Sequence, residues 1–346
     1  MIINTLPKIT WRFLKANNTE LEELNIEKKK YKDDFFRIEN KEFDENFKNI
    51  KFGVSEEILR INEENRNFQR NYVVEINQKL NEEHRFEFTK EENEIMDLHN
   101  IHLKENSEAT ILLDFKSEED VEVIRNSVVK IKAEKKSKLK LVLIQRLSKI
   151  SKNLISVVSN IEEDAEVSFV QVELGSEKSF VSYVANVLGR GAKSYINTAY
   201  FVDGQRELDI DYLINHIGRD GFSNMSVNGA LKDMCKKRFA GTLDFKKGCI
   251  GSDGNEEEYV TLLDKDVRNL AIPLLLAHEH DIQGNHAASA GRIDQDMLYY
   301  IMSRGLSEKE AKSIVVESKI TPVLDLIDNE KLKEEIKSFV HRGIIQ

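Results

Sequence analysis

Proline, cysteine and long apolar runs are all scarce in this sequence. Its 346 residues include three prolines, Pro7, Pro273 and Pro322. Because proline removes a hydrogen-bond donor from a β-ladder, this scarcity favours a continuous stack of strands. No run of about 18 apolar residues occurs, and the first residues lack the basic and apolar regions of a secretory signal. We therefore expect a cytoplasmic protein without a membrane-spanning helix.

Basic residues are too few for a nucleic-acid-binding protein. The 51 Lys and Arg residues are outnumbered by 61 Asp and Glu, and the formal net charge is −10. Because affinity for nucleic acid comes mainly from basic side chains that neutralise phosphates, generic nucleic-acid binding is excluded. A lysine cluster at 28–30 lies within residues 25–50, which we interpret as a solvated, linker-like segment.

The two cysteines, Cys235 and Cys249, are expected to be reduced thiols in a cytosolic chain. A role as sulfur carriers is one interpretation, since the thiolate is the reactive form of cysteine. Four basic residues near Cys235 would lower its pKa if they are close in space: Lys232, Lys236, Lys237 and Arg238. The alternative is that both cysteines are small buried hydrophobic residues.

Residues 1–105 are expected to form a polar, helical region. Ser55 could cap a helix that extends to about Glu83. This prediction depends on apolar residues that recur near helical spacing, namely Leu59, Phe68, Tyr72, Ile76 and Leu80.

Residues 106–291 show the alternation that is typical of half-buried strands. Apolar residues alternate with polar ones at Leu139, Leu141 and Leu143, Val170, Val172 and Leu174, Leu208, Ile210 and Tyr212, and Leu243 and Phe245. Turn-like pairs follow one another at Asp164-Ala165, Gly191-Ala192, Asp220-Gly221 and Gly248-Cys249, about 26 to 30 residues apart. This spacing fits a solenoid coil of two or three short strands. A β-solenoid is our first prediction and a two-sheet sandwich is the second.

Residues 292–346 are expected to form a helical domain. Asp294 is a predicted N-cap, Ile293 could staple onto Leu298, and Gly305 suits the position just past the helix end. Ser307 and Glu310 form the pattern of a capping box for the next helix. Pro322 is expected to kink or split that helix, and a last helix carries Leu332, Ile336 and Val340 on one face.

Four segments of this chain carry distinctive patterns: TWRFLKANNTELEEL (10–24), GALKDMCKKRFAGTLDFKKG (229–248), LLDKD (262–266) and NHAASAGRIDQDMLYYIMSRGLSEKEA (285–311). Together they resemble the SufB/SufD family of SUF iron–sulfur cluster assembly proteins. The resemblance is dense in the last third of the chain. It implies a right-handed parallel β-helix with flanking helices, and a non-catalytic scaffold that assembles and transfers iron–sulfur clusters.

The resemblance also implies partners. A SufB-like paralogue would pair through the β-helix, and a SufC-like ATPase would dock on the C-terminal helices around Arg304, Gly305, Leu306 and Ser307. The chain has no GxxxxGK[ST] phosphate-binding loop, so the ATPase must be another protein.

Two thiolates cannot supply the four ligands of an ordinary cluster. We therefore expect no stably bound cofactor in this chain alone, and a transient cluster or iron only in the complex; whether the isolated chain forms a homodimer is left open.

Single positions favour the SufD side of the family. SufB-type chains carry a glutamate after the signature histidine and a cysteine after the segment that matches LLDKD, whereas this chain has Ala287 and Val267. The histidine remains as His286, which the resemblance implies as an iron or cluster ligand at the heterodimer interface. Many SufD-type chains also carry a cysteine two residues earlier, where this chain has Gly284.

Three histidines form an H-x-H-x5-H pattern at His278, His280 and His286. Strand alternation would place the first two on one face, where imidazole nitrogens could share a metal; the alternative is that they are ordinary polar residues at a solenoid edge.

Two enzymatic hypotheses remain beside the scaffold. One is a metal-dependent hydrolase that uses these histidines, and the other is a solenoid polysaccharide lyase or hydrolase in which Asp209 and Asp211 act as paired carboxylates. A solvated face is the competing interpretation of the two aspartates.

Overall fold

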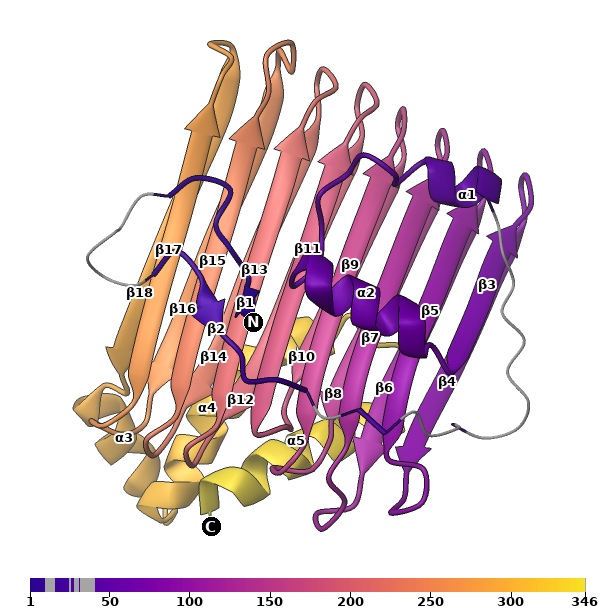
Figure 1. The fold of residues 1–346 in the computed structure, drawn as a ribbon. Coiled ribbons are helices and arrows are strands. Elements are labelled where there is room, and N and C mark those ends of the chain that lie inside the picture. Colours follow the sequence, from indigo (N-terminus) through magenta and orange to yellow (C-terminus); the bar gives the residue numbers. More distant parts are fainter. Residues whose placement is uncertain (10–15, 25, 28–30, 32–40, 346) are drawn as a thin grey trace.

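The computed structural model describes residues 1–9, 16–24, 26–27, 31 and 41–345. Within them, sixteen strands form two eight-stranded parallel sheets that face each other (Figure 1). Successive strands alternate between the sheets, so each coil of the chain contributes one strand to each. The result is a parallel β-solenoid of eight coils, which confirms the first prediction; the handedness of the coiling stays a prediction.

One sheet contains the odd-numbered strands β3 (Phe68–Val74), β5 (Glu94–Leu103), β7 (Ile124–Ala133), β9 (Lys152–Ile161), β11 (Lys178–Val187), β13 (Glu207–His216), β15 (Lys236–Phe245) and β17 (Arg268–Ala277). The other contains β4 (Lys79–Phe88), β6 (Glu108–Ser117), β8 (Lys138–Arg146), β10 (Glu166–Glu173), β12 (Lys193–Val202), β14 (Phe222–Leu231), β16 (Ser252–Leu262) and β18 (Ile282–Arg292). Alternate residues of each strand point inward, as the sequence pattern predicts. Ile210 and Tyr212, for example, lie fully buried in the central core.

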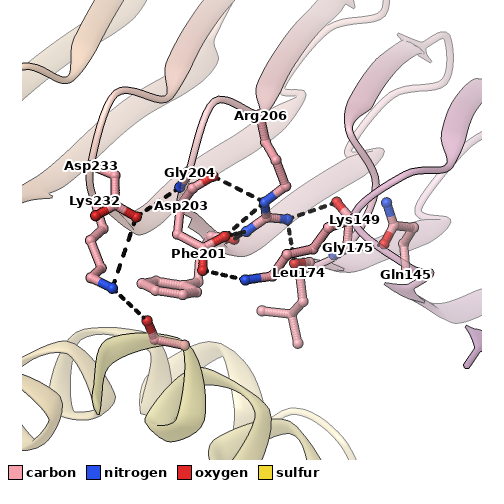
Figure 2. A network of polar contacts seen from close by, with 11 residues as sticks. Gln145, Lys149, Leu174, Gly175, Phe201, Asp203, Gly204, Arg206, Lys232 and Asp233 are labelled. Atoms are coloured by element: carbon pink, nitrogen blue, oxygen red, sulfur yellow. Dashed lines mark hydrogen bonds and ion pairs between the residues drawn. The ribbon is translucent and has the colours of Figure 1, made fainter. Parts of the chain in front are cut away.

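The turns that connect the even sheet to the odd sheet stack on one another as closely as the strands do. The buried guanidinium of Arg206 donates hydrogen bonds to the carbonyl oxygens of Leu174 (2.7 Å), Gly175 (3.1 Å) and Phe201 (3.1 Å), and it also pairs with Asp203 (Figure 2). These bonds satisfy carbonyls that turns leave without a ladder partner. One arginine therefore ties its own turn to the turn of the preceding coil.

The N-terminal segment covers the outer face of the odd sheet (Figure 1). It contains the short antiparallel pair β1 (Ile2–Ile3) and β2 (Thr19–Glu20), and the helices α1 (Lys41–Glu45) and α2 (Glu56–Asn65). Phe43 and Phe47 pack on Val158 and Val184 of the sheet. Farther along, Ile58 contributes to a second apolar cluster on the same face. The segment is thus held by burial of apolar surface.

Three C-terminal helices follow the last strand: α3 (Gln295–Met302), α4 (Glu308–Leu324) and α5 (Glu330–Ile345). Residues of α4 and α5 pack against the outer face of the even sheet, where Val316 and Ile320 share a cluster with Val172 and Phe201. At Gly343 an added Cβ would lie 2.5 Å from the ring of Phe201, so glycine allows α5 its close approach. None of the described helices is long and apolar enough to cross a membrane.

The predicted helical region at 1–105 is wrong in its second half. The helix capped by Ser55 ends at Asn65, and the first strand begins at Phe68. A spacing of four residues, as between Phe68, Tyr72 and Leu80, fits the helical period of 3.6 and is also a multiple of the strand period of two. The solenoid therefore extends from Phe68 to Arg292 rather than from 106 to 291. The lysine cluster at 28–30 and most of residues 25–40 lie outside the described residues.

The other helix predictions can be compared directly. The capping box of Ser307 and Glu310 is present, and the side chain of Asp294 caps α3 as expected. Ile293 and Leu298 share one apolar cluster, as the predicted staple requires. Pro322 does not split α4, because the proline lies in the last turn and the helix ends two residues later at Leu324.

The close stacking of turns yields a stability prediction. At Gly175 an added Cβ would lie 1.9 Å from the backbone oxygen of Leu147, whereas at Gly291 it would meet nothing within 4 Å. We expect Gly175→Ala to lower the free energy of unfolding by at least about 2 kcal/mol, since a backbone contact cannot yield without shifting a coil. Gly291→Ala is the matched control and should leave stability within about 0.5 kcal/mol of the parent. Urea denaturation measures both, and equal midpoints would contradict the prediction.

Candidate functional site

The two ends of the solenoid differ in how they are covered. At the first coil the ring of Tyr31 is buried and packs on Phe68, Phe86 and Phe88, with ring centroids 5.4 to 6.2 Å apart. At the last coil, β17 and β18 each form the edge of a sheet. Most of β18 is exposed, on its inward and outward faces alike. Among the described residues, therefore, nothing closes this end, which we call the open end.

His286 lies on the inward face of the open end. In the parallel register His286 of β18 stands beside Glu256 of β16, which in turn stands beside Met225 of β14. Met225 is a core residue, and Glu256 is 3% exposed. Because aligned positions of a parallel sheet share a face, His286 faces the space that the core would occupy if another coil followed. Its neighbour Ala287 points to the outer face.

Two buried carboxyl groups lie one coil below His286. Glu258 forms a buried ion pair with Lys237 of β15, whereas Oε2 of Glu256 is buried and has no hydrogen-bond partner among the described atoms. Burial and the nearby Glu258 raise the pKa of Glu256 to about 8. At Gly241 an added Cβ would lie 2.2 Å from Oε1 of Glu256, so the opposite strand leaves room for this carboxyl group.

The predicted strand-face pair of His278 and His280 does not form. β17 ends at Ala277, and both histidines lie in the exposed turn before β18. Nε2 of His278 lies 3.7 Å from Oδ1 of Asp244. Within the described residues, no three His, Cys, Asp or Glu side chains gather in a way that could hold a metal ion.

Both cysteines are free thiols with fully buried side chains in the central core. Burial raises the pKa of Cys235 to about 11 and also raises the pKa of Cys249. The condition for a lowered Cys235 pKa, basic side chains close enough to outweigh burial, is therefore not met. Two of these neighbours are already paired, Lys237 with Glu258 and Arg238 with Asp209. The geometry agrees with the alternative interpretation of small buried hydrophobic residues.

Asp209 and Asp211 are buried beneath the N-terminal segment, so neither the solvated face nor an open pair of carboxylates is present. Asp209 accepts hydrogen bonds from Arg238 (2.8 Å) and from the side chain of Asn4 (2.9 Å), and Thr19 also bonds to it. Burial raises the pKa of Asp211 to about 7. A polymeric substrate could not reach these groups without displacing the segment.

The C-terminal helices present an exposed aromatic and aliphatic surface. The exposed side chains, which we call the α3–α4 patch, are Met297, Tyr299, Tyr300, Met302 and Ile314. Arg304 lies at the edge of this patch, where its guanidinium stacks over the ring of Tyr300 at 5.1 Å and donates a 2.8 Å hydrogen bond to the hydroxyl oxygen. Gly305 has a φ of +96°, as expected for a residue just past a helix end. Leu306 and Ser307 complete the turn into α4.

Residues 86–319 match the family model described as SUF system FeS cluster assembly, SufBD core domain. The chain belongs to this SufBD family. The matched range covers most of the solenoid, α3 and most of α4, including the middle coils in which the sequence segments quoted above are sparse.

Curated relatives support the same assignment. SufD of Bacillus subtilis (strain 168) is 30% identical over 159 residues, which are 46% of this chain and 36% of that protein. A SufBD family protein of Staphylococcus saprophyticus is 26% identical over 200 residues, or 58% of this chain and 43% of that protein. SufBD family protein ML0593 of Mycobacterium leprae is 23% identical over 200 residues, or 58% of this chain and 23% of that protein. This SufBD chain thus matches less than half the length of each of these relatives.

The buried pair of Glu256 and Glu258 was not among the predicted site residues. The signal is present in the sequence, because Gly254, Glu256, Glu258 and Val260 alternate as inward positions of one strand. Three consecutive glutamates hide this pattern, since an acidic run is usually interpreted as a solvated surface. The neighbouring Glu257 does lie exposed on the outer face.

Glu256 also yields a pH prediction. Its pKa of about 8 in the folded protein exceeds the value of about 4.3 for an unfolded glutamate. Between these two pKa values the folded state binds one more proton at Glu256 than the unfolded state does. The contribution of Glu256 to the free energy of unfolding is therefore complete at low pH, and it falls by up to ~1.4 kcal/mol per pH unit as the pH rises. Glu258, Lys237 and His286 are the ionisable groups nearest to it in the core and register.

We expect Glu256→Gln to remove this part of the pH dependence, and Glu257→Gln to retain it. Urea unfolding of both variants and the parent across this pH range measures the slopes. Glu173 and Asp211, whose pKa values burial raises to about 7, contribute equally to all three proteins. Identical slopes for Glu256→Gln and Glu257→Gln would contradict the prediction.

Proposed function

We propose that this chain is a SufD-like scaffold subunit that pairs with a SufB-like paralogue and a SufC-like ATPase to assemble and transfer iron–sulfur clusters. The observation that carries the proposal is the open end of the solenoid with His286 on its inward face. In this function the chain has no turnover chemistry of its own, and the cluster is cargo held between subunits.

The open end supports pairing with a second solenoid. An edge strand offers unpaired N–H and C=O groups, and proteins usually protect such edges with charges, proline or a covering segment. Residues 282–291 of β18 contain no Lys, Glu or Pro, and after Ile282 their inward positions are small or polar. A SufB-like solenoid that continues the stack would pair this edge and cover the inward face. His286 would then lie at the interface.

The α3–α4 patch supports docking of the ATPase. Tyr299 is 75% exposed and Tyr300 is 60% exposed, which is unusual for aromatic side chains on a monomer surface. Aromatic residues, methionine and arginine are the types that protein interfaces favour. The capped ends of α3 and α4 fix the turn that carries Arg304. This surface lies on rigid, properly terminated helices.

The thiol chemistry supports a scaffold that relies on its partner for soft ligands. Cys235 and Cys249 are buried, and burial raises both pKa values, so neither offers a ready thiolate. A cluster at the open end would therefore take its sulfur ligands from the SufB-like subunit. His286 would contribute one imidazole nitrogen.

The two enzymatic alternatives find less support. A polysaccharide lyase needs an accessible acidic groove, but Asp209 and Asp211 are covered by the N-terminal segment. A hydrolase based on the histidine pattern needs its ligands together, but His278 and His280 lie in a turn and His286 lies on the inward face of β18.

The docking proposal predicts a selective loss of one partner. We expect co-expression of the three proteins to yield one complex, and Tyr299→Asp in this chain to release the ATPase while the SufB-like subunit stays bound. Ile76→Asp is the matched control, because Ile76 is also an exposed apolar side chain but lies in a turn near the first coil. Co-purification followed by size-exclusion chromatography measures the composition. Recovery of this chain alone from unmodified proteins would refute the proposal.

The ligand role of His286 predicts a loss of cluster without a loss of assembly. Anaerobic reconstitution of the three-protein complex should give a lower yield of cluster with His286→Ala than with the parent, measured by visible absorption and iron content. The complex itself should still form, since truncation of most interface side chains to alanine costs under about 1 kcal/mol, and His286→Ala, unlike Tyr299→Asp, introduces no charge. Full cluster yield from the variant would reduce this chain to an architectural role.

A further inference from the structure

Glu256 is the buried ionisable group that the fold explains least. It is 3% exposed, and its Oε2 has no hydrogen-bond partner among the described atoms. A buried carboxyl group without partners costs stability. Two other buried glutamates of the interior have partners through at least one oxygen. Glu258 pairs with Lys237, although its Oε2 also lacks a hydrogen-bond partner, and Glu173 bonds to Gln171 and Ser179. Stability alone therefore gives no reason for a carboxyl group at position 256.

The register neighbour of Glu256 that can bind a metal ion lies on the side of the open end. On the inward face of the even sheet its register neighbours are Met225 on the core side and His286 on the open side. Met225 is apolar. Of the two register neighbours, His286 is therefore the one whose side chain can bind the same metal ion as the Glu256 carboxylate. Strands of a sheet lie about 4.8 Å apart, a separation across which one metal ion can contact side chains from both.

The inward positions next to His286 carry small side chains. Gly284 and Ala288 flank it on β18, and Ala271 is an inward residue of β17, whereas Pro273, Leu275 and Ile282 are the larger inward residues of this coil. The coils below place large rings at their inward positions, including Tyr183, Tyr212 and Phe239. Gly241 also makes room on the opposite strand. Little side-chain volume therefore surrounds His286 on its own strand, and the Glu256 carboxyl group occupies the room that Gly241 leaves.

We propose that Glu256 and His286 together form a two-ligand half-site for a divalent transition-metal ion of the Fe²⁺ class. Carboxylate and imidazole are ligands that such ions accept. Two ligands make an incomplete site, so water or the molecule that closes the open end supplies the others. The inference rests on the proposed function, because it assigns a second ligand to the cargo at this end.

Co²⁺, a spectroscopic probe for Fe²⁺, tests the half-site on the purified full-length chain. Calorimetry gives the association constant, and paramagnetic broadening of the His286 ring signals gives the location. We expect Glu256→Gln and His286→Ala each to lower the association constant at least about ten-fold. Glu257→Gln, one residue away on the exposed outer face, should leave it unchanged. The double variant should bind at least as weakly as the worse single variant, because it removes both protein ligands of one ion.

Two outcomes would overturn the inference: parent-like Co²⁺ binding by Glu256→Gln, or no binding near His286 in the unmodified chain. Urea denaturation checks that each variant folds. If Glu256→Gln does not fold, Glu256→Asp replaces it. This variant keeps the carboxyl group but shortens the side chain by one methylene, and it should bind Co²⁺ more weakly than the parent. Co-purification with the partners does not depend on this site. If the unmodified chain binds no Co²⁺ near His286 but still co-purifies with its partners, this inference is refuted and the proposed function stands.

Discussion

The parallel register of the coils is the constraint on which the rest of the structure depends. Each strand bonds to the strand one coil earlier and one coil later, so every inward residue stacks on its counterpart in the neighbouring coils. Such a stack satisfies its backbone everywhere except at its two ends. Tyr31 helps to close the first end with an aromatic cluster. The last end has its strand edges unpaired and its inward face exposed, which makes it the natural place for an interaction.

The same register decides which polar groups the interior can hold. Buried polar side chains in the middle coils satisfy one another across strands: Arg125 donates to Asn153, which donates to Ser179, which donates to Glu173. Such a chain of bonds compensates for the loss of water around each group. Near the open end this compensation stops at the pair of Glu258 and Lys237. Glu256 lies on the same strand as Glu258 but outside this pair, so its environment differs from that of Glu173 although both are buried glutamates.

Sequence reasoning succeeded where a signal is local and failed where it depends on what covers a surface. The capping box at Ser307 and the coil spacing are local, and both appear in the structure. The helix predicted from Ser55 to about Glu83 failed because a spacing of four residues fits two periods. Asp209 could not be predicted as buried, since its burial depends on Asn4 and Thr19, about two hundred residues earlier. The direction of the Cys235 pKa could not be predicted for a related reason, because it depends mainly on the burial of the thiol.

The even sheet links the two surfaces that the proposed function uses. α4 and α5 pack on this sheet, and an ion-pair network joins Glu335 of α5 to Arg146 of β8, which also holds Asp114 of β6. Lys232, in the turn after β14, donates a 3.0 Å hydrogen bond to the carbonyl oxygen of Gly343 near the end of α5 (Figure 2). β18, which carries His286, is the edge strand of the same sheet. In the proposed function, a partner that pulls on the C-terminal helices would therefore act directly on the sheet whose last strand forms the open end.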